Sequence, residues 1–163
     1  MKRIKYIHIV LTVLLAAMLT ATAMILWRLR TPVQGTFVPP EFDAGAVAGK
    51  PDVTDQAMLY TELDVAGNYK VSLCGCPSME QGRLHLLFTS PADNSAWLKL
   101  RIMGKNGQIL GESGLVRPGA YLPYVLLEQN PRPGETLTVK VISYQPDTYF
   151  SMGTANIKVT VRI

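Results

Sequence analysis

The alternation of apolar and polar residues divides the chain into one long apolar run near its start and a series of short segments after it. The run, Tyr6 to Trp27, holds 22 residues without Asp, Glu, Lys or Arg. A helix of roughly 20 apolar residues crosses the hydrocarbon core of a bilayer. Three basic residues precede the run and two follow it, a bias that favours a cytoplasmic N-terminus. We therefore expect residues 1–30 to be a transmembrane signal-anchor of a single-pass cell-membrane protein whose C-terminal domain is extracytoplasmic.

A cleaved signal peptide is the alternative interpretation of the same run. Ala21-Thr22-Ala23 has the small-residue pattern of a cleavage site. The apolar residues continue past this site to Trp27, which makes the run long for a signal-peptide core. We adopt the anchor interpretation. Under either interpretation the rest of the chain is exported.

From about residue 57 onward the pattern has the two-residue period of β-strands. Residues 97–102, 137–142 and 157–163 alternate apolar and polar side chains, which is typical of strands with one buried and one solvent-facing side. Residues 84–89 form an apolar run of strand length. Weaker strand candidates cover residues 58–63, 69–73, 108–112 and 121–127.

Turn residues separate these segments at short intervals. Asn106-Gly107 is a strong hairpin signal because both residue types tolerate a positive φ. Short strands with frequent turns favour an antiparallel sandwich, so we expect an all-β, antiparallel, immunoglobulin-like sandwich of about seven or eight strands over residues 57–163. Its predicted core contains Leu86, Phe88, Trp97 or Leu98, Leu100, Ile102, Leu110, Leu126, Val139, Val141 and Val159.

Residues 31–56 are predicted to form a linker between the anchor and the sandwich. This segment contains four prolines and three glycines, and proline fixes φ and removes a backbone donor. Phe37 and Phe42 flank a Pro-Pro step within it. These two aromatic residues either pack back on the edge of the domain or dock a partner as a short extended peptide.

The distribution of charge narrows the range of partners. The whole chain carries +4, but five of its 16 basic residues flank the apolar run, so residues 31–163 hold 11 basic and 12 acidic residues, a net charge of −1. The two signs are interspersed in that part of the sequence, whereas nucleic-acid binding needs a basic footprint. We therefore expect no nucleic-acid partner. The expected partners are the membrane, through the N-terminal helix, and another envelope protein or a second copy of the chain.

Cys74 and Cys76 form an unusual Cys-Gly-Cys-Pro motif. Disulfides form in exported proteins, so a local disulfide or a buried thiol pair that shapes a strand end is one interpretation. Disulfides to another chain and binding of a soft metal are the others. Metal binding needs more donors than Met79 and His85, which lie nearby in the sequence, and we expect no metal and no cofactor.

The sequence shows no marked constellation for catalysis, and we expect the protein not to be an enzyme. Nucleophilic catalysis needs a base, and His85 is the one histidine beyond the apolar run. The Gly-Glu-Ser-Gly segment around Ser113 departs from the spacing of a nucleophile elbow. Tyr144 and Tyr149 lie in or beside loops, and aromatic residues are enriched at interfaces. These two tyrosines are therefore candidates for partner docking, or else residues at the edge of the core.

The C-terminal two-thirds of the chain carries a set of short motifs. They are Trp97-Leu-Lys-Leu-Arg-Ile102, Asn106-Gly107, Glu112-Ser-Gly-Leu-Val-Arg-Pro-Gly119, Pro133-Gly134-Glu135 and Tyr144-Gln-Pro-Asp-Thr-Tyr149, followed by Ser151-Met-Gly153. Over residues 57–163 the chain resembles a group of small, uncharacterised, membrane-anchored surface proteins of Gram-positive bacteria. The resemblance implies an extracytoplasmic β-sandwich without assigned catalytic residues, of the kind found in surface or secretion assemblies.

These observations favour a non-enzymatic, membrane-anchored interaction or structural module, a subunit of a surface or secretion-type assembly. The alternative function is an extracytoplasmic ligand- or glycan-binding adhesive domain that uses the tyrosine-bearing loops. A third hypothesis is a redox or metal module built on Cys74 and Cys76.

Overall fold

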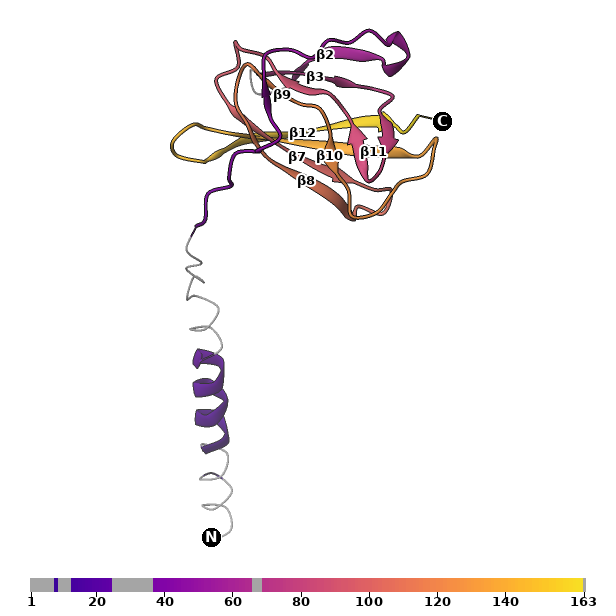
Figure 1. Ribbon diagram of the computed structural model, residues 1–163. Coiled ribbons are helices and arrows are strands. Elements are labelled where there is room, and N and C mark those ends of the chain that lie inside the picture. Colours follow the sequence, from indigo (N-terminus) through magenta and orange to yellow (C-terminus); the bar gives the residue numbers. More distant parts are fainter. Residues whose placement is uncertain (1–7, 9–12, 25–36, 66–68, 163) are drawn as a thin grey trace. The chain divides into compact units, whose positions relative to one another are not determined.

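The computed structural model of the 163-residue chain describes residues 8, 13–24, 37–65 and 69–162. The chain divides into two compact units, Met1–Val38 and Pro39–Ile163, and each is described here by itself (Figure 1). We call the second of these the β unit.

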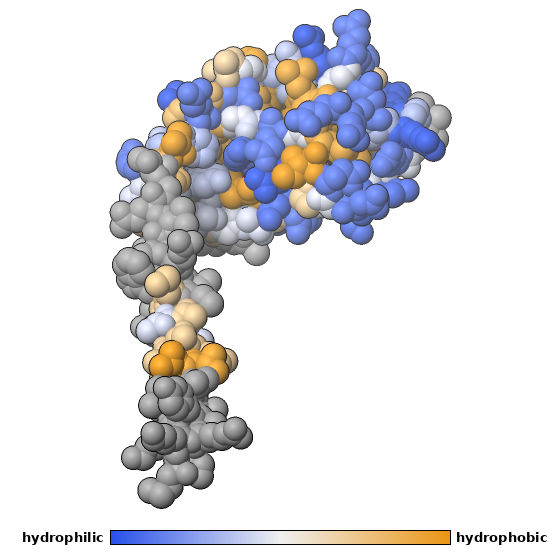
Figure 2. Space-filling model, turned by 90° about the horizontal axis from the view of Figure 1, so that it is seen from below, coloured by the Kyte–Doolittle hydropathy of each residue, from blue (hydrophilic) through white to orange (hydrophobic). Residues whose placement is uncertain are grey.

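A helix over residues 13–24 makes up most of the described part of the first unit. Its side chains are apolar apart from two threonines, and the large apolar ones are each more than half exposed (Figure 2). Both hydroxyls donate to carbonyls one turn back, Thr20 Oγ1 to Ala17 O at 2.9 Å and Thr22 Oγ1 to Met18 O at 3.0 Å. Within the described residues, no helix has the length and apolar character that crossing a membrane requires. The predicted span from Tyr6 to Trp27 extends outside the described residues on both sides.

The β unit consists of short strands, and its described residues form twelve of them with one 3-10 turn, η1 (Gln56–Met58). The strands are β1 (Val47–Ala48), β2 (Tyr60–Val65), β3 (Tyr69–Cys74), β4 (Ser78–Glu80), β5 (Arg83–His85), β6 (Phe88–Ser90), β7 (Trp97–Met103), β8 (Ile109–Val116), β9 (Ala120–Leu122), β10 (Val125–Leu126), β11 (Thr136–Tyr144) and β12 (Ser151–Thr160). All pairings between these strands are antiparallel. The predicted all-β, antiparallel fold is therefore confirmed.

The strands form two main layers around one core. One layer is a five-stranded sheet in the order β1-β9-β6-β3-β2, and the other is a four-stranded sheet in the order β12-β11-β7-β8; a small third sheet has the order β10-β5-β4 (Figure 1). Val71 and Phe88 of the first layer and Leu100 and Val141 of the second are fully buried in one cluster. Side chains of two facing sheets that share a core define a sandwich.

The immunoglobulin-like part of the prediction is not confirmed. In an immunoglobulin domain the strand beside strand B is strand E, which follows strand C of the opposite sheet in the chain. Here β6 lies beside β3 and precedes the crossing to β7 in the other sheet. The order of strands in the two layers therefore differs from that of an immunoglobulin domain.

The segment predicted as one strand over residues 84–89 is broken into β5 and β6. Leu84 lies opposite Val125 and Phe88 lies opposite Leu122, so this side of the ladder contains one more residue than its partner. The two pairs belong to different sheets, so the extra residue lies where the chain bends from one sheet to the other, and Leu87 has a positive φ of 48° at this point. The bend moves the chain from the three-stranded sheet into the five-stranded one, and it gives more strands than we predicted.

The predicted core is confirmed except at Leu126. Leu126 is 62% exposed, whereas its neighbours Val125 and Leu127 are buried. A shift of one residue turns a strand side chain to the opposite face, and the break before β10 produces that shift. At the Trp97 or Leu98 alternative, Leu98 is the buried residue and Trp97 lies on the opposite side of β7.

The hairpin predicted at Asn106-Gly107 is confirmed. It joins β7 to β8, with Met103 opposite Ile109. Gly104 N donates to Gln108 O at 2.9 Å, and Gly107 has a positive φ of 77°. This turn fixes which residues of β7 and β8 lie opposite each other.

Residues 41–48, part of the predicted linker, pack along the edge of the β unit, and we call them the edge segment. Phe42 forms a parallel bridge with Leu115 of β8. Asp43 N donates to Leu115 O at 2.9 Å and Leu115 N donates to Glu41 O at 2.8 Å. The end of the segment, β1, pairs with β9. The edge segment therefore joins the two layers along one side of the sandwich, and the β unit begins at Pro39 and not at residue 57.

Candidate interaction surfaces

The outer face of the four-stranded sheet, which points away from the core, carries an aromatic cluster where β7 begins. Trp97 lies on this face because the next residue, Leu98, points into the core. The rings of Phe42 and Tyr149 meet Trp97 edge-on, with centroids 4.9 Å and 5.3 Å away. The Arg117 guanidinium lies 3.9 Å from the centre of the Phe42 ring, in cation–π contact. We call Phe42, Trp97, Tyr149 and Arg117 the aromatic cluster; its rings hold the edge segment against the sheet.

Three of the four predicted partner-docking residues meet at this end of the sheet. Phe42 and Tyr149 contact Trp97 directly, and Tyr144 lies opposite Trp97 in the pairing of β11 with β7. Phe37 belongs to the first unit and is 63% exposed. Phe42 packs back on the edge of the domain, one of its two predicted roles, and its docking role stays a prediction.

Four basic side chains gather on the same outer face. The alternation of β7, β11 and β12 directs Lys99, Arg101, Lys140 and Lys158 away from the core. Lys140 lies opposite Arg101, and Lys158 lies two residues away from the position opposite Lys140. We call these four residues the basic face. Figure 2 shows hydrophilic side chains over much of the β unit with apolar ones between them.

Glu112 of β8 is the one acidic residue that the four strands place on this face, so four positive charges meet one negative charge. Lys99 Nζ lies 2.8 Å from Glu112 Oε2, and Arg101 Nε pairs with the other carboxylate oxygen. Burial by itself raises the pKa of Glu112, but hydrogen bonds from Lys99 and Arg101 outweigh it and hold that pKa below its ordinary value. Within the described residues Lys140 and Lys158 take part in no ion pair. Their charges are therefore not compensated by neighbouring carboxylates.

A groove lies between β8 and β10, beside the sheet. Its larger part has a volume of about 650 Å³, and an adjoining hollow of about 180 Å³ shares Glu112 and Leu126 with it. Ile109 on one bank is 48% exposed and Leu126 on the other is 62% exposed. The residues that line the larger part are Ile109, Gly111, Glu112, Leu126, Leu127 and Glu128. We call this the β8–β10 groove.

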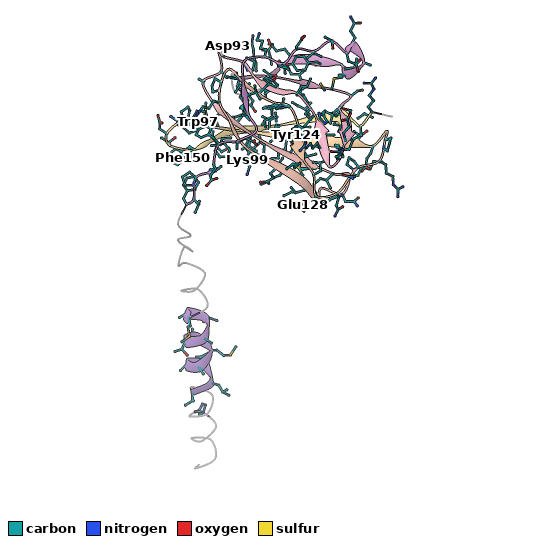
Figure 3. All side chains as sticks on the ribbon, in the orientation of Figure 1. Asp93, Trp97, Lys99, Tyr124, Glu128 and Phe150 are labelled. Carbon is teal, nitrogen blue, oxygen red and sulfur yellow. The ribbon has the colours of Figure 1, made fainter. Side chains whose placement is uncertain are left out.

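The backbone forms the floor of the groove, and one glycine allows it. A Cβ atom at Gly111 would lie 2.2 Å from Leu126 O, so β10 approaches β8 this closely only because the residue has no side chain. Glu128 N donates to Leu110 O at 2.7 Å, just beyond this contact. Figure 3 labels Glu128 at this end of the β unit and Tyr124, which lines the adjoining hollow. Apolar banks with two carboxylates beside them are suited to binding an apolar side chain that has a basic neighbour.

Cys74 and Cys76 are both free thiols, at the end of β3. Burial raises the pKa of Cys74 to about 11, with smaller contributions from Asp55 and Cys76. The backbone of the motif joins two distant segments, because Cys76 N donates to Met58 O at 3.0 Å and Gly75 O accepts from Thr160 N at 2.9 Å. The backbone of the motif therefore ties the end of β3 to these two segments, and the role of the two thiols stays a prediction. The part of the chain that the structure describes holds no group of three His, Cys, Asp or Glu side chains placed to bind a metal ion.

The Ser113 hydroxyl forms hydrogen bonds with the backbone inside the sheet. Lys99 lies opposite Leu115 and Arg101 opposite Glu112, so β8 contains an extra residue here. Ser113 Oγ fills the bulge, accepting from Leu100 N at 2.9 Å and donating to Gly114 O at 2.7 Å. This pairing explains why a buried serine stands in the Gly-Glu-Ser-Gly segment.

In comparisons with family models, curated proteins and solved structures, nothing matches this chain.

Neither the basic face nor the β8–β10 groove was predicted from the sequence. The signal for the basic face is a basic residue at outward positions of three strands, which is visible only once the pairing of those strands is known. The signal for the groove is Leu126 beside Gly111, and these residues are 15 positions apart in the sequence. The residues of the basic face and of the groove are dispersed along the sequence, so no local run of charged or apolar residues marks either surface.

Proposed function

We propose that this chain is a non-enzymatic, membrane-anchored module whose extracytoplasmic β unit binds another envelope protein, or a second copy of itself, through the β8–β10 groove. The observation that carries the proposal is the pair of exposed aliphatic side chains, Ile109 and Leu126, on the two banks of an open groove. The resemblance to anchored surface proteins of Gram-positive bacteria fits the same function, in a surface or secretion-type assembly.

The composition of the groove supports a protein partner. The centres of protein interfaces are apolar and their rims are polar, and here Leu126 and Ile109 are flanked by Glu112 and Glu128. Glu128 forms no ion pair within the described residues. The groove therefore suits a partner segment that places an apolar side chain between the banks and a basic one near Glu128.

The N-terminal run supports the membrane anchor. A helix that is apolar on all sides is stable where it is surrounded by lipid or by other apolar surface. The hydroxyls of Thr20 and Thr22 are already bonded to the backbone of their own helix, as the absence of water in a bilayer demands of polar groups. The 22-residue run without charged residues is long enough to cross it.

The test is site-specific photo-cross-linking of the full-length chain in cells. A photoreactive amino acid at position 126 is expected to form a cross-link with one dominant envelope protein or with a second copy. The control position is Asn106, which is exposed in the β7–β8 turn. Identical bands from both positions, or none from position 126, would contradict the proposal, and the second result would favour the glycan- or ligand-binding alternative.

A charge substitution sharpens the same test. Leu126→Arg places a charge on the bank of the groove, and the exposure of Leu126 lets the variant fold. We expect loss of the cross-link from a photoreactive residue at the neighbouring position 109. Asn156→Arg is the matched control, since it adds the same charge at an exposed position of β12, at the opposite edge of the four-stranded sheet from β8, and it is expected to leave the cross-link intact.

A further inference from the structure

We propose that the basic face and the aromatic cluster beside it bind the anionic lipid surface of the membrane that holds the chain. The inference rests on the proposed membrane anchor and goes beyond it, because it assigns a ligand to a second surface of the β unit. The β8–β10 groove stays open to a protein partner beside this face.

The charge of the basic face is complementary to that of an anionic lipid surface. The part of the chain after residue 30 carries a net charge of −1, yet the outer face of one sheet collects four cations against one carboxylate. Two of the cations, Lys140 and Lys158, have no carboxylate partner among the described residues. Anionic headgroups attract Lys and Arg side chains that lie within a Debye length of the surface. A sheet face presents its cations side by side toward a planar surface of opposite charge.

Aromatic and apolar residues at the end of this face also suit a lipid surface. Trp and Tyr are enriched at the level of lipid headgroups, and the cluster provides Trp97 and Tyr149. The next residue, Phe150, is 71% exposed, and Met152 is 42% exposed. Figure 3 shows Trp97, Lys99 and Phe150 at one end of the β unit. Basic residues combined with exposed apolar ones are the composition of surfaces that lie in the membrane interface.

Only a short length of chain separates the β unit from the apolar run. Twelve residues lead from Trp27 to Pro39, and an extended chain spans at most about 3.6 Å per residue, or about 43 Å in all. The chain enters the β unit next to the aromatic cluster, because Phe42 is part of both the edge segment and the cluster. A tether of this length makes docking intramolecular, so weak attractions suffice to hold the face on the lipid.

The experiment uses the full-length chain with Trp27→Phe, which leaves Trp97 as the sole tryptophan of the two in the sequence. The protein is reconstituted into vesicles of phosphatidylcholine with brominated acyl chains, with or without phosphatidylglycerol. We expect quenching of Trp97 fluorescence in the vesicles with phosphatidylglycerol, weak quenching in phosphatidylcholine alone, and reversal by added salt.

Lys140→Gln combined with Lys158→Gln is expected to lower the ratio of docked to free β unit about 25-fold, since each lysine near an anionic surface contributes about a fivefold factor. The control pair is Lys50→Gln with Arg132→Gln, which removes the same charge from exposed positions outside the basic face. We expect the control variant to show the same quenching of Trp97 fluorescence in vesicles with phosphatidylglycerol as the chain with both lysines.

The results separate this inference from the proposed function. Protein that floats with the vesicles but shows no quenching, or equal quenching in both lipids, overturns the lipid-binding face and leaves the anchor intact. Quenching that survives loss of Lys140 and Lys158 also overturns it. Protein that does not float with the vesicles overturns the anchor and, with it, this inference.

Discussion

Replacing Gly114 by alanine tests whether the edge segment holds one side of the sandwich together. A Cβ atom at Gly114 would lie 2.6 Å from Asp43 N and 2.7 Å from Asp43 Cα. Neither atom belongs to a flexible side chain, so the backbone of the edge segment must move away from β8. The substitution therefore separates the segment from the sheet without removing any side chain.

The expected cost follows from the hydrogen bonds that depend on this approach. Asp43 N bonds to Leu115 O, Leu115 N bonds to Glu41 O, and Gly114 N bonds to Asp43 Oδ2, at 2.9, 2.8 and 2.8 Å. Each such bond contributes about 1 kcal/mol net, so their loss lowers the free energy of unfolding by about 3 kcal/mol. For a unit of this size that corresponds to a fall in Tm of roughly 10 °C.

The assay combines thermal melting with hydrogen exchange measured by mass spectrometry, on the full-length chain in detergent. We expect faster exchange at residues 41–48 together with the lower Tm. Gly75→Ala is the matched control, because its Cβ atom would meet Leu59 at an ordinary 3.5 Å, and we expect it to change stability by less than about 0.5 kcal/mol. Unchanged exchange at residues 41–48 in Gly114→Ala would refute the assigned role of the edge segment.

Three further predictions concern single side chains. Because the pKa of Cys74 is raised to about 11, its thiol should resist alkylation near pH 8 while the half-buried Cys76 reacts; mass spectrometry of the labelled chain checks this, and equal labelling would contradict it. Glu112→Gln should lower stability by about 1 kcal/mol near pH 7; since the folded-state pKa of this carboxyl is lowered, the difference is fully present above its ordinary pKa and should shrink in melts at successively lower pH, as the pH falls through the folded-state pKa. Asn94→Ala removes three hydrogen bonds of a side chain that is 8% exposed, so it should cost about 3 kcal/mol in thermal unfolding, whereas the exposed Asn156→Ala should stay within about 0.5 kcal/mol.

The strands were predictable from the sequence where the two-residue period is unbroken. In residues 97–102 each apolar residue after Trp97 enters the core, and each charged one faces outward, because a strand places alternate side chains on opposite faces. The prediction was wrong at Leu126, where a break between β9 and β10 shifts the alternation by one residue. A break of this kind depends on the opposite strand, which a local pattern does not contain.

The edge segment was not predictable because its partners are distant. The prolines and glycines of residues 31–56, which include it, are typical of a linker, and no neighbouring stretch of the sequence pairs with it. The bonds that order it come from Gly114 and Leu115, more than 70 residues further along the chain. Long-range pairing thus overrides local composition.

The candidate surfaces could not be predicted from the sequence for the same reason. Lys99, Lys140 and Lys158 are 41 and 18 residues apart and become neighbours only through the pairing of β7, β11 and β12. Phe42 and Tyr149 were candidates on sequence grounds, and their contacts with Trp97 became visible only in the fold. Composition and charge counts do not show which residues of different strands become neighbours. That depends on how the strands pair and in which register.

The most direct test of the central claim is the position of the β unit in intact cells. The reporter is Asn106→Cys in a full-length chain with Cys76→Ser, so that the exposed turn carries the accessible thiol. We expect a membrane-impermeant maleimide to label it in intact cells, on a chain of full-length mass that stays in the membrane fraction. Labelling only after lysis, or a shortened chain that begins after Ala23 and leaves the membrane, would contradict a membrane-anchored, extracytoplasmic module.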